Sequence, residues 1–369
     1  MEDLWRILQE DEKYEEGTIL SSMCTKPLPI AKTAHQMFLA SNLGDAGLFR
    51  GARRLEQEAV RKLADLLNGR DSVGFIVSGG TEANLLALWA ARNSANVSSP
   101  EVVIPESAHF SFDKICNILG LKAISAKLDD TYRVKPEAVA HSVTSRTVAI
   151  VGTAGTTELG VVDPIPSLSK IAKTHDVYLH VDAAFGGLVI PFLEPAERNA
   201  LAFDFSLEGV KSITVDSHKM GMAPIPAGGI LFRNQSLLDP IKTETPYLSE
   251  TSQYTFVGTR NGASAAATWS VFEFLGIEGF KKTVKRCMTL TEFLSKEIEA
   301  LGINLLIKPT MNIVAFRTSN SKKTAEELRK TGWFVSHVPR LDCIRVVIMP
   351  HLKRRHIEAF LKDLNKTVY

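Results

Sequence analysis

The sequence has few cysteines, no surplus of charge of one sign and no long uninterrupted apolar run. Its four cysteines are scattered without CxxC spacing, which argues against a zinc site or a disulfide framework. The 43 basic and 41 acidic residues are interspersed and leave a formal net charge of +2. Electrostatics therefore gives no reason to expect a nucleic acid or an anionic membrane as a partner.

Membrane insertion and secretion are not expected either. The longest apolar stretch, Val177–Leu193, is interrupted by His180, Asp182 and two glycines, so it is not a bilayer-spanning segment. The amino terminus begins with Met1-Glu2-Asp3 and lacks the basic-then-apolar order of a signal peptide. We therefore expect a cytoplasmic enzyme or binding protein with reduced cysteines and no metal site.

Short apolar runs alternate with helical segments along much of the chain. The predicted strands are Val73–Val77, Val102–Ile104, Val148–Val151, Val177–Val181, Ile213–Val215 and Gly229–Phe232. The predicted helices between them are Thr81–Arg92, Phe110–Leu119, Pro136–His141 and Ile165–Lys173. Continuous apolar strands that alternate with helices predict an α/β fold with a large, mostly parallel sheet covered on both faces.

The chain, at 369 residues with 45% hydrophobic residues, is long enough for more than one core. We expect three parts. They are an N-terminal segment over residues 1–50, a large domain over 51–260 and a small α+β C-terminal domain over 261–369. The last part begins with a long helical region, Ala263–Ala300, and continues with strand candidates at Asn312–Phe316 and Ile344–Met349.

A glycine-rich turn follows the first predicted strand. It reads Ser78-Gly79-Gly80-Thr81-Glu82-Ala83-Asn84. Glycine lets the backbone approach a ligand closely, Thr81 can cap the helix, and the unpaired amides at the helix start favour a phosphate. The motif matches neither GxxxxGK(S/T) nor GxGxxG, so a nucleotide site is disfavoured. The alternative is a plain turn before a helix.

Two charged residues lie at the ends of later strands. Asp182 ends an apolar strand, where a carboxylate is costly unless a cation or several donors face it. It can be a loop cap, or it can accept a hydrogen bond from a protonated heterocycle nitrogen. Lys219 follows the strand Ile213–Val215 and can be a solvated lysine or an amine nucleophile toward carbonyls. A phosphate turn, an aspartate and a lysine in this order are typical of a pyridoxal-5′-phosphate (PLP) site.

The ordered motifs resemble those of the group II PLP-dependent decarboxylases. The resemblance rests on the glycine turn, Ala108-His109, Gly155-Thr156-Thr157, His180-Val181-Asp182-Ala183-Ala184 and Asp216-Ser217-His218-Lys219. More narrowly, Ser22–Thr25, Asn42–Asp45, Gly258–Arg260 and Arg345–His351 are similar to the archaeal L-tyrosine/L-aspartate decarboxylases. This implies the aspartate-aminotransferase-like PLP fold (fold type I), a homodimer with sites at the interface, and production of tyramine or β-alanine. The products would serve methanofuran or coenzyme A biosynthesis.

The resemblance also implies a role for individual residues. Lys219 would hold the cofactor as a Schiff base, and Asp182 would keep the ring nitrogen protonated. His109 would stack on the ring opposite Ala184. Gly80 and Thr81 would hold the phosphate with help from His218, Thr157 would bond the ring hydroxyl, and Gly258 and Thr259 would reach the phosphate of the neighbouring subunit.

Two departures from the family pattern stand out. Asp216 replaces an asparagine that is common in relatives, and it is not expected to face the phosphate directly. The mobile loop of the animal enzymes is shortened between Thr245 and Gly258, so its catalytic tyrosine has no assured counterpart in Tyr247 or Tyr254. Arg345 is either a buried structural residue or a clamp for a substrate carboxylate.

Three functions compete. An amino-acid α-decarboxylase is favoured, with tyrosine before aspartate as substrate. The alternatives are another PLP lyase, a glutamate decarboxylase or a cysteine desulfurase, although Cys343 adjoins a strand and is expected to be packed. The third is a non-catalytic homologue kept as a binding module. The intact set of Lys219, Asp182 and His109 argues against this last function.

Overall fold

The computed structural model describes residues 1–368, which form two compact units. One unit is Pro27–Lys282; the other is Met1–Lys26 together with the residues from Thr283 onward. The first residues join the second unit because Leu20 N donates to Phe334 O at 2.9 Å and Val347 N donates to Leu20 O at 2.7 Å. The boundaries of these two units differ from the divisions at residues 50 and 260 that the sequence suggests.

The larger unit contains a seven-stranded sheet in the order β1-β7-β6-β5-β4-β2-β3. Only β7 is reversed, since it pairs antiparallel with both β1 and β6 while the remaining pairs are parallel. The strands are β1 (Val73–Val77), β2 (Glu101–Pro105), β3 (Lys122–Ala126), β4 (Thr147–Thr153), β5 (Tyr178–Asp182), β6 (Val210–Val215) and β7 (Gly228–Phe232). The prediction of a mostly parallel α/β sheet is confirmed.

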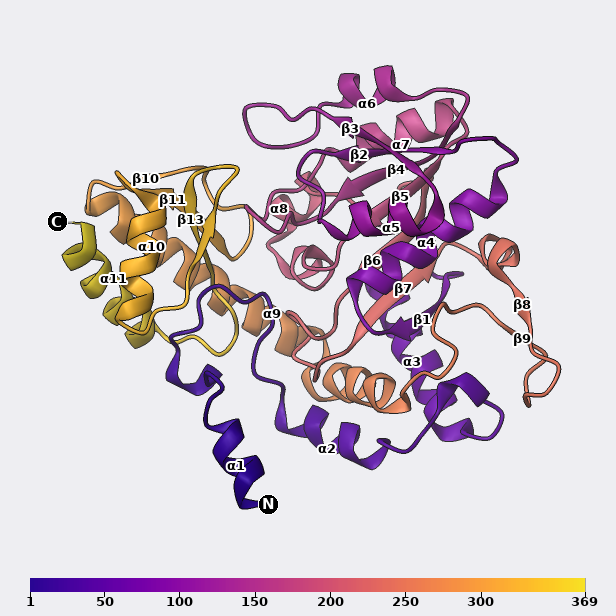
Figure 1. The fold of residues 1–369 in the computed structure, drawn as a ribbon, viewed down its shortest axis with the longest axis horizontal. Coiled ribbons are helices and arrows are strands. Elements are labelled where there is room, and N and C mark those ends of the chain that lie inside the picture. The colour runs from indigo at the N-terminus through magenta and orange to yellow at the C-terminus, as the bar shows by residue number, and fades with distance from the viewer. Residues whose placement is uncertain (369) are drawn as a thin grey trace. The chain divides into compact units, whose positions relative to one another are not determined.

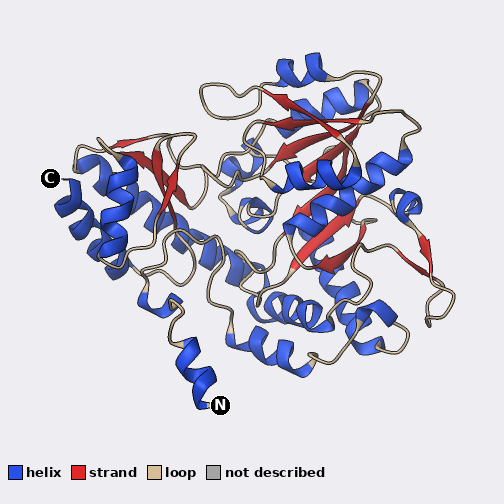
Figure 2. Ribbon diagram, viewed as in Figure 1, coloured by secondary structure: helices blue, strands red, loops and turns tan. Residues whose placement is uncertain are grey.

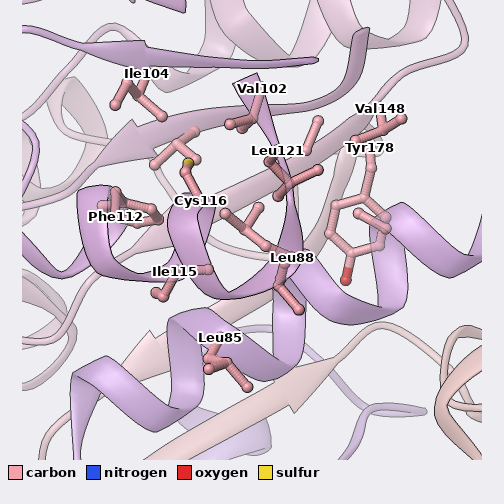
Figure 3. Close-up of a cluster of buried hydrophobic side chains, with 14 residues drawn as sticks. Leu85, Leu88, Val102, Ile104, Phe112, Ile115, Cys116, Leu121, Val148 and Tyr178 are labelled. Carbon is pink, nitrogen blue, oxygen red and sulfur yellow. The ribbon is translucent and has the colours of Figure 1, made fainter. Parts of the chain in front are cut away.

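Several helices of the larger unit pack against strands of this sheet (Figure 1). They are α3 (Arg50–Leu66), α4 (Gly80–Ser94), α5 (Ser111–Leu119), α6 (Pro136–Ser142) and α7 (Ile165–Thr174). The unit also contains α2 (Pro29–Met37) and α8 (Pro195–Ala200). Figure 3 shows one core cluster, in which Phe112 and Ile115 of α5 lie against Val102 and Ile104 of β2. Truncating a fully buried phenylalanine such as Phe112 to alanine costs roughly 3–5 kcal/mol of stability.

The smaller unit is an antiparallel sheet with helices packed on it (Figure 2). Its strand order is β10-β11-β13-β12. The strands are β10 (Asn304–Leu305), β11 (Ile313–Arg317), β12 (Ser336–Val338) and β13 (Cys343–Val347). Helix α10 (Ser321–Lys330) contacts β12 and β13, and α11 (Arg354–Val368) packs on α10. Helix α1 (Glu2–Leu8) also belongs to this unit and has no buried residue. The prediction of a small α+β unit near the C-terminus is confirmed.

One long helix and several short elements complete the description. Helix α9 (Gly262–Ala300) runs through the boundary between the units and is kinked at Gly276, where φ is 55°. Strands β8 (Thr243–Glu244) and β9 (Ser252–Gln253) form a separate hairpin. The 3₁₀ helices are η1 (Tyr14–Glu16), η2 (Leu43–Asp45), η3 (Gly186–Leu188), η4 (Ile190–Phe192), η5 (Gln235–Leu237) and η6 (Asp239–Ile241). Across residues 1–368, no helix combines the length and the apolar composition that a membrane crossing requires.

Candidate active site

The predicted site residues follow strands whose carboxyl ends meet at one edge of the large sheet. Strands β1, β4, β5 and β6 run in the same direction, because only β7 is reversed. Ligands of such sheets bind beyond the carboxyl ends of the strands. This edge carries the glycine turn after β1, Asp182 at the end of β5 and the segment Asp216–Lys219 after β6.

Both glycines of the turn occupy positions where a side chain would be crowded. Gly79 has φ +154°, a conformation that side chains rarely tolerate, and a Cβ there would lie 3.0 Å from His218 Cε1. A Cβ on Gly80 would lie 3.1 Å from Asp216 Oδ2 and 3.3 Å from the Cβ of Ala184. Helix α4 begins at Gly80 and no side chain caps its first amides. The turn thus brings uncapped amides next to the other predicted residues.

Asp182 is buried and both of its carboxylate oxygens accept hydrogen bonds. Only 6% of its surface is exposed. The backbone N–H of Ala184 donates to Oδ1 at 3.0 Å, and the side-chain amide of Asn84 donates to Oδ2 at 2.9 Å. Donors of this kind favour the charged form of a buried carboxyl group. Asp182 is therefore equipped to be an ionised acceptor.

Lys219, Asp216 and His218 lie close together. Lys219 Nζ lies 3.0 Å from Asp216 Oδ2, and His218 Nε2 lies 3.6 Å from the same oxygen. The backbone N–H of Ala227 donates to His218 Nδ1 at 3.1 Å, so the proton of a neutral His218 is on Nε2. Burial lowers the pKa of His218, and Asp216 partly opposes that effect. Lys219 is thus the ionic partner of Asp216. The expectation that Asp216 does not face the phosphate directly stays a prediction.

His109 lies within electrostatic range of the same charges. It follows β2, it is half-buried, and its Nδ1 accepts from Ser111 N at 3.2 Å. Burial is the main cause that lowers the pKa of His109; the carboxylates of Asp182 and Asp216 raise it and Lys219 lowers it. A neutral ring with an N–H on Nε2 is therefore the form present near pH 7.

Other predicted residues lie in less closely connected places. Thr157 is half-buried in the loop after β4, beside the end of β5, where Ala154 N donates to Asp182 O at 2.8 Å. Thr259 is exposed, and its neighbour Gly258 packs on the backbone of Gly44. The expected contacts of Thr157 with the ring hydroxyl and of Thr259 with the phosphate of a neighbouring subunit therefore stay predictions.

The structure shows the contacts and the exposure of the residues for which the sequence allows two interpretations. Arg345, on β13, donates to Ser21 O at 2.5 Å and to Ser336 Oγ at 3.3 Å, both within its own unit. Tyr247 is 85% exposed, whereas Tyr254 stacks on Phe75 with ring centroids 6.2 Å apart. Cys343 is fully buried, as expected, which makes it a poor mobile nucleophile for a desulfurase.

The motifs in the sequence do not assign a role to the groups that surround Asp182. Asn84, His180 and Ser212 are connected to it by hydrogen bonds, although two of them belong to the quoted motifs. Their signal was present, because His180 precedes Asp182 by two residues and therefore shares its face of β5. Polar residues at alternate positions of an apolar strand indicate a buried polar network on that face.

These groups fit PLP. Its aldehyde requires an amine, its ring nitrogen an acceptor and its phosphate several donors. Lys219, Asp182 and the uncapped start of α4 supply these three in one place. The carboxylate of Asp216, next to the glycine turn, does not attract an anion, and Lys219 at 3.0 Å counters its charge.

Solved structures define the class of protein. A sphingosine-1-phosphate lyase from Burkholderia pseudomallei superposes with a TM-score of 0.92 at 28% identity, covering 100% of this chain and 89% of that one. A glutamate decarboxylase from Lactobacillus brevis has the same fold, with a TM-score of 0.89 at 22% identity and coverage of 100% and 91%. The chain therefore has the fold of the fold type I PLP-dependent decarboxylases and lyases.

Sequence comparisons give the family. Residues 52–319 match the pyridoxal-dependent decarboxylase conserved domain. A relative from Methanothermobacter thermautotrophicus, named probable L-tyrosine/L-aspartate decarboxylase, is 50% identical over 95% of this chain and 97% of its own length. The L-aspartate decarboxylase of Thermococcus kodakarensis is 48% identical, with coverage of 97% and 94%. The chain belongs to the pyridoxal-dependent decarboxylase family and is an amino-acid decarboxylase that uses PLP.

Proposed function

We propose that this enzyme removes the α-carboxylate of L-tyrosine, L-aspartate or both, and so forms tyramine and β-alanine. The observation that carries the proposal is the near-complete coverage, at 50% identity, of a relative named for both substrates. The L-aspartate decarboxylase of Thermococcus kodakarensis supports aspartate in particular. The predicted preference for tyrosine over aspartate is open to a direct assay.

We propose roles for the buried polar residues at the sheet edge. Lys219 binds the cofactor carbonyl through Nζ, and Asp182 accepts a hydrogen bond from the ring nitrogen. His109 covers one face of the ring and Ala184 the other. Bound PLP withdraws electrons from Cα and so allows the bond to the carboxylate to break. The chain's part is to orient that carboxylate, to keep Asp182 ionised and to exclude water.

The remaining groups would anchor the cofactor. Gly80, Thr81 and His218 are proposed to hold the phosphate, because the uncapped amides of α4 begin there. Thr157, half-buried in the loop after β4, would donate to the ring hydroxyl. Thr259 is proposed to reach the phosphate of a second subunit, since it is exposed in its own chain.

We also propose a cytoplasmic homodimer with shared sites. The exposure of Gly258 and Thr259 supports an interface at that loop. In this setting β-alanine would supply coenzyme A biosynthesis, and tyramine would supply methanofuran biosynthesis.

An amino-acid panel tests the proposal. Purified enzyme, saturated with PLP, is incubated with each of the twenty amino acids, and both CO₂ and the amine product are measured. We expect CO₂ with β-alanine from aspartate, with tyramine from tyrosine, or with both. Glutamate is the alternative substrate in the same panel. Formation of a keto acid without CO₂ would contradict decarboxylation, and turnover of glutamate alone would contradict the two named substrates.

A further inference from the structure

A chain of buried polar side chains leads from β6 to Asp182. Its members are Ser212 on β6, His180 on β5 and Asn84 on α4, and each is at most 1% exposed. The register pairs His180 with Ser212, and Asp182 with Thr214. Because alternate residues of a strand share a face, these four lie on one side of the sheet, where Asn84 meets them. Buried polar groups of this kind are costly unless they are bonded, so the arrangement specifies particular bonds.

The hydrogen bond to the carboxylate of Asp182 determines how Asn84 is oriented. A carboxylate can only accept, so the 2.9 Å contact with Asp182 Oδ2 comes from the Nδ2 amino group of Asn84. Oδ1 of Asn84 therefore faces the opposite way and must accept. It accepts from Thr214 Oγ1 at 2.7 Å and contacts His180 Nε2 at 2.9 Å.

The orientation of Asn84 in turn determines the tautomer of His180. Since Asn84 Oδ1 accepts, the ring proton of His180 is on Nε2. Nδ1 is then an acceptor, and Ser212 Oγ lies 2.8 Å from it as the donor. Burial lowers the pKa of His180 to about 4, although Asp182 partly opposes this. A neutral ring can keep this direction of donation throughout the neutral pH range.

All three bonds donate in the direction of Asp182. Ser212 donates to His180, His180 donates to Asn84, and Asn84 donates to Asp182. We propose that Asn84 is a positioning residue for the cofactor-binding carboxylate, and that His180 fixes its orientation so that Asp182 is held as an ionised acceptor. This inference rests on the proposed role of Asp182 toward the ring nitrogen of PLP.

The physical effect is on the orientation of Asp182. The directed chain presents the Asn84 amide N–H to Asp182 Oδ2, so this oxygen is held as an acceptor. Removing the Asn84 amide removes one of the two donors to the carboxylate. Asp182 then loses both its orientation and part of the stabilisation of its charge. The bond to a ring N–H is the contact that weakens.

The effect can be isolated by combining a substitution of the side chain with the replacement of one atom of the cofactor, and by measuring binding for each combination. Apoenzyme is titrated with PLP and with 1-deaza-PLP, in which a C–H group replaces the ring nitrogen, and the two dissociation constants are compared. A hydrogen bond to a charged group corresponds to a preference for PLP of about 10- to 100-fold in the wild type. We expect Asn84→Leu to reduce that preference by about fivefold or more.

Matched variants separate positioning from general destabilisation. Asn312→Leu makes the same change at another buried asparagine, whose Nδ2 donates to Ile348 O in the other unit, and it should keep the wild-type preference. His180→Gln retains an N–H donor for Asn84 and should keep most of the preference. His180→Leu removes that donor and should reduce the preference. If Asn84→Leu does not fold, the comparison of His180→Gln with His180→Leu tests whether the orientation of Asn84 determines the preference for PLP.

Two outcomes overturn the inference in different ways. Equal weakening of both cofactors in Asn84→Leu, as in Asn312→Leu, would show that Asn84 only supports the fold. A wild-type preference near one would remove the role of Asp182 and the positioning role with it. Neither outcome changes the decarboxylation assay, so the substrate proposal stands or fails separately.

Discussion

Asp182 is a buried carboxylate whose two hydrogen-bond donors are already in place, and this makes it the residue whose removal has the clearest expected effect. Asp182→Ala should still bind PLP through Lys219 and the phosphate groups, but a ring that is not held protonated is a poor electron sink. We expect turnover to fall by about 10²-fold or more. The measurement is kcat at cofactor saturation, with cofactor occupancy read from visible absorbance. Turnover within about twofold of the wild type would exclude this role.

Lys219 provides a second test at the scale of the residue. Its Nζ lies 3.0 Å from Asp216, so the amine is held at the sheet edge rather than in solvent. The loaded protein should be yellow, and borohydride reduction should fix the cofactor on the peptide that contains Lys219. Peptide mass spectrometry locates the label, and Lys219→Arg is the control that should carry none. Labelling of a different lysine in the wild type would contradict the assignment.

At the scale of the element, apolar runs predict some strands better than others. The run Val148–Val151 predicts β4 within its observed bounds, because every residue of that central strand is buried. Nothing comparable predicts β3 (Lys122–Ala126), since it is the last strand of the sheet and most of its residues are not buried. An edge strand is stabilised by pairing on one side, and its side chains need no continuous apolar pattern.

The site shows the same division between local and non-local information. The chain order of glycine turn, aspartate and lysine predicts Gly80, Asp182 and Lys219, because each lies at or just beyond the end of a strand. The link from Asn84 to His180 cannot be predicted in this way, since it depends on where α4 crosses β5. The register of neighbouring strands and the placement of a helix are tertiary properties that a single strand pattern does not encode.

The connection between the N-terminal segment and the loop after β13 predicts a pH effect. His351 Nε2 donates to Ile19 O at 3.1 Å, and Thr25 donates to Nδ1 at 2.9 Å. Burial lowers the pKa of His351 to about 4. Because the unfolded ring titrates near pH 6.5, its stabilising contribution is complete above that pH and is lost as the pH falls from about 6.5 to about 4.

The corresponding measurement is the thermal midpoint at two pH values. We expect the decrease in Tm between pH 7 and pH 5 to be smaller in His351→Gln than in the wild type, because the variant has no proton to bind there. His175→Gln, which removes an exposed histidine at the end of α7, is the control and should behave like the wild type. Equal decreases in all three proteins would contradict the assignment.

At the scale of the whole molecule, the site draws on segments far apart in the chain. Residues near positions 80, 109, 182 and 219 meet at one sheet edge, whereas Thr259 is exposed beside the η2 turn. A residue that resembles a phosphate ligand and yet faces outward is explained if it serves a second subunit. The proposed homodimer therefore accounts for the position of Thr259, and it predicts that each site combines residues from two chains.

Mixing two inactive variants tests this sharing directly. Lys219→Ala lacks the amine, and Thr259→Trp is bulky enough to block a phosphate. In a hybrid dimer with shared sites, one site carries both lesions and the other carries neither, so activity returns. Random subunit exchange between equal amounts should restore up to about a quarter of wild-type activity. The measurement is decarboxylation after mixing, with exchange verified by mass spectrometry of differently tagged chains. Proven exchange without recovered activity would mean that each subunit builds its site alone, and Thr259 would then have no part in binding the phosphate of the partner subunit.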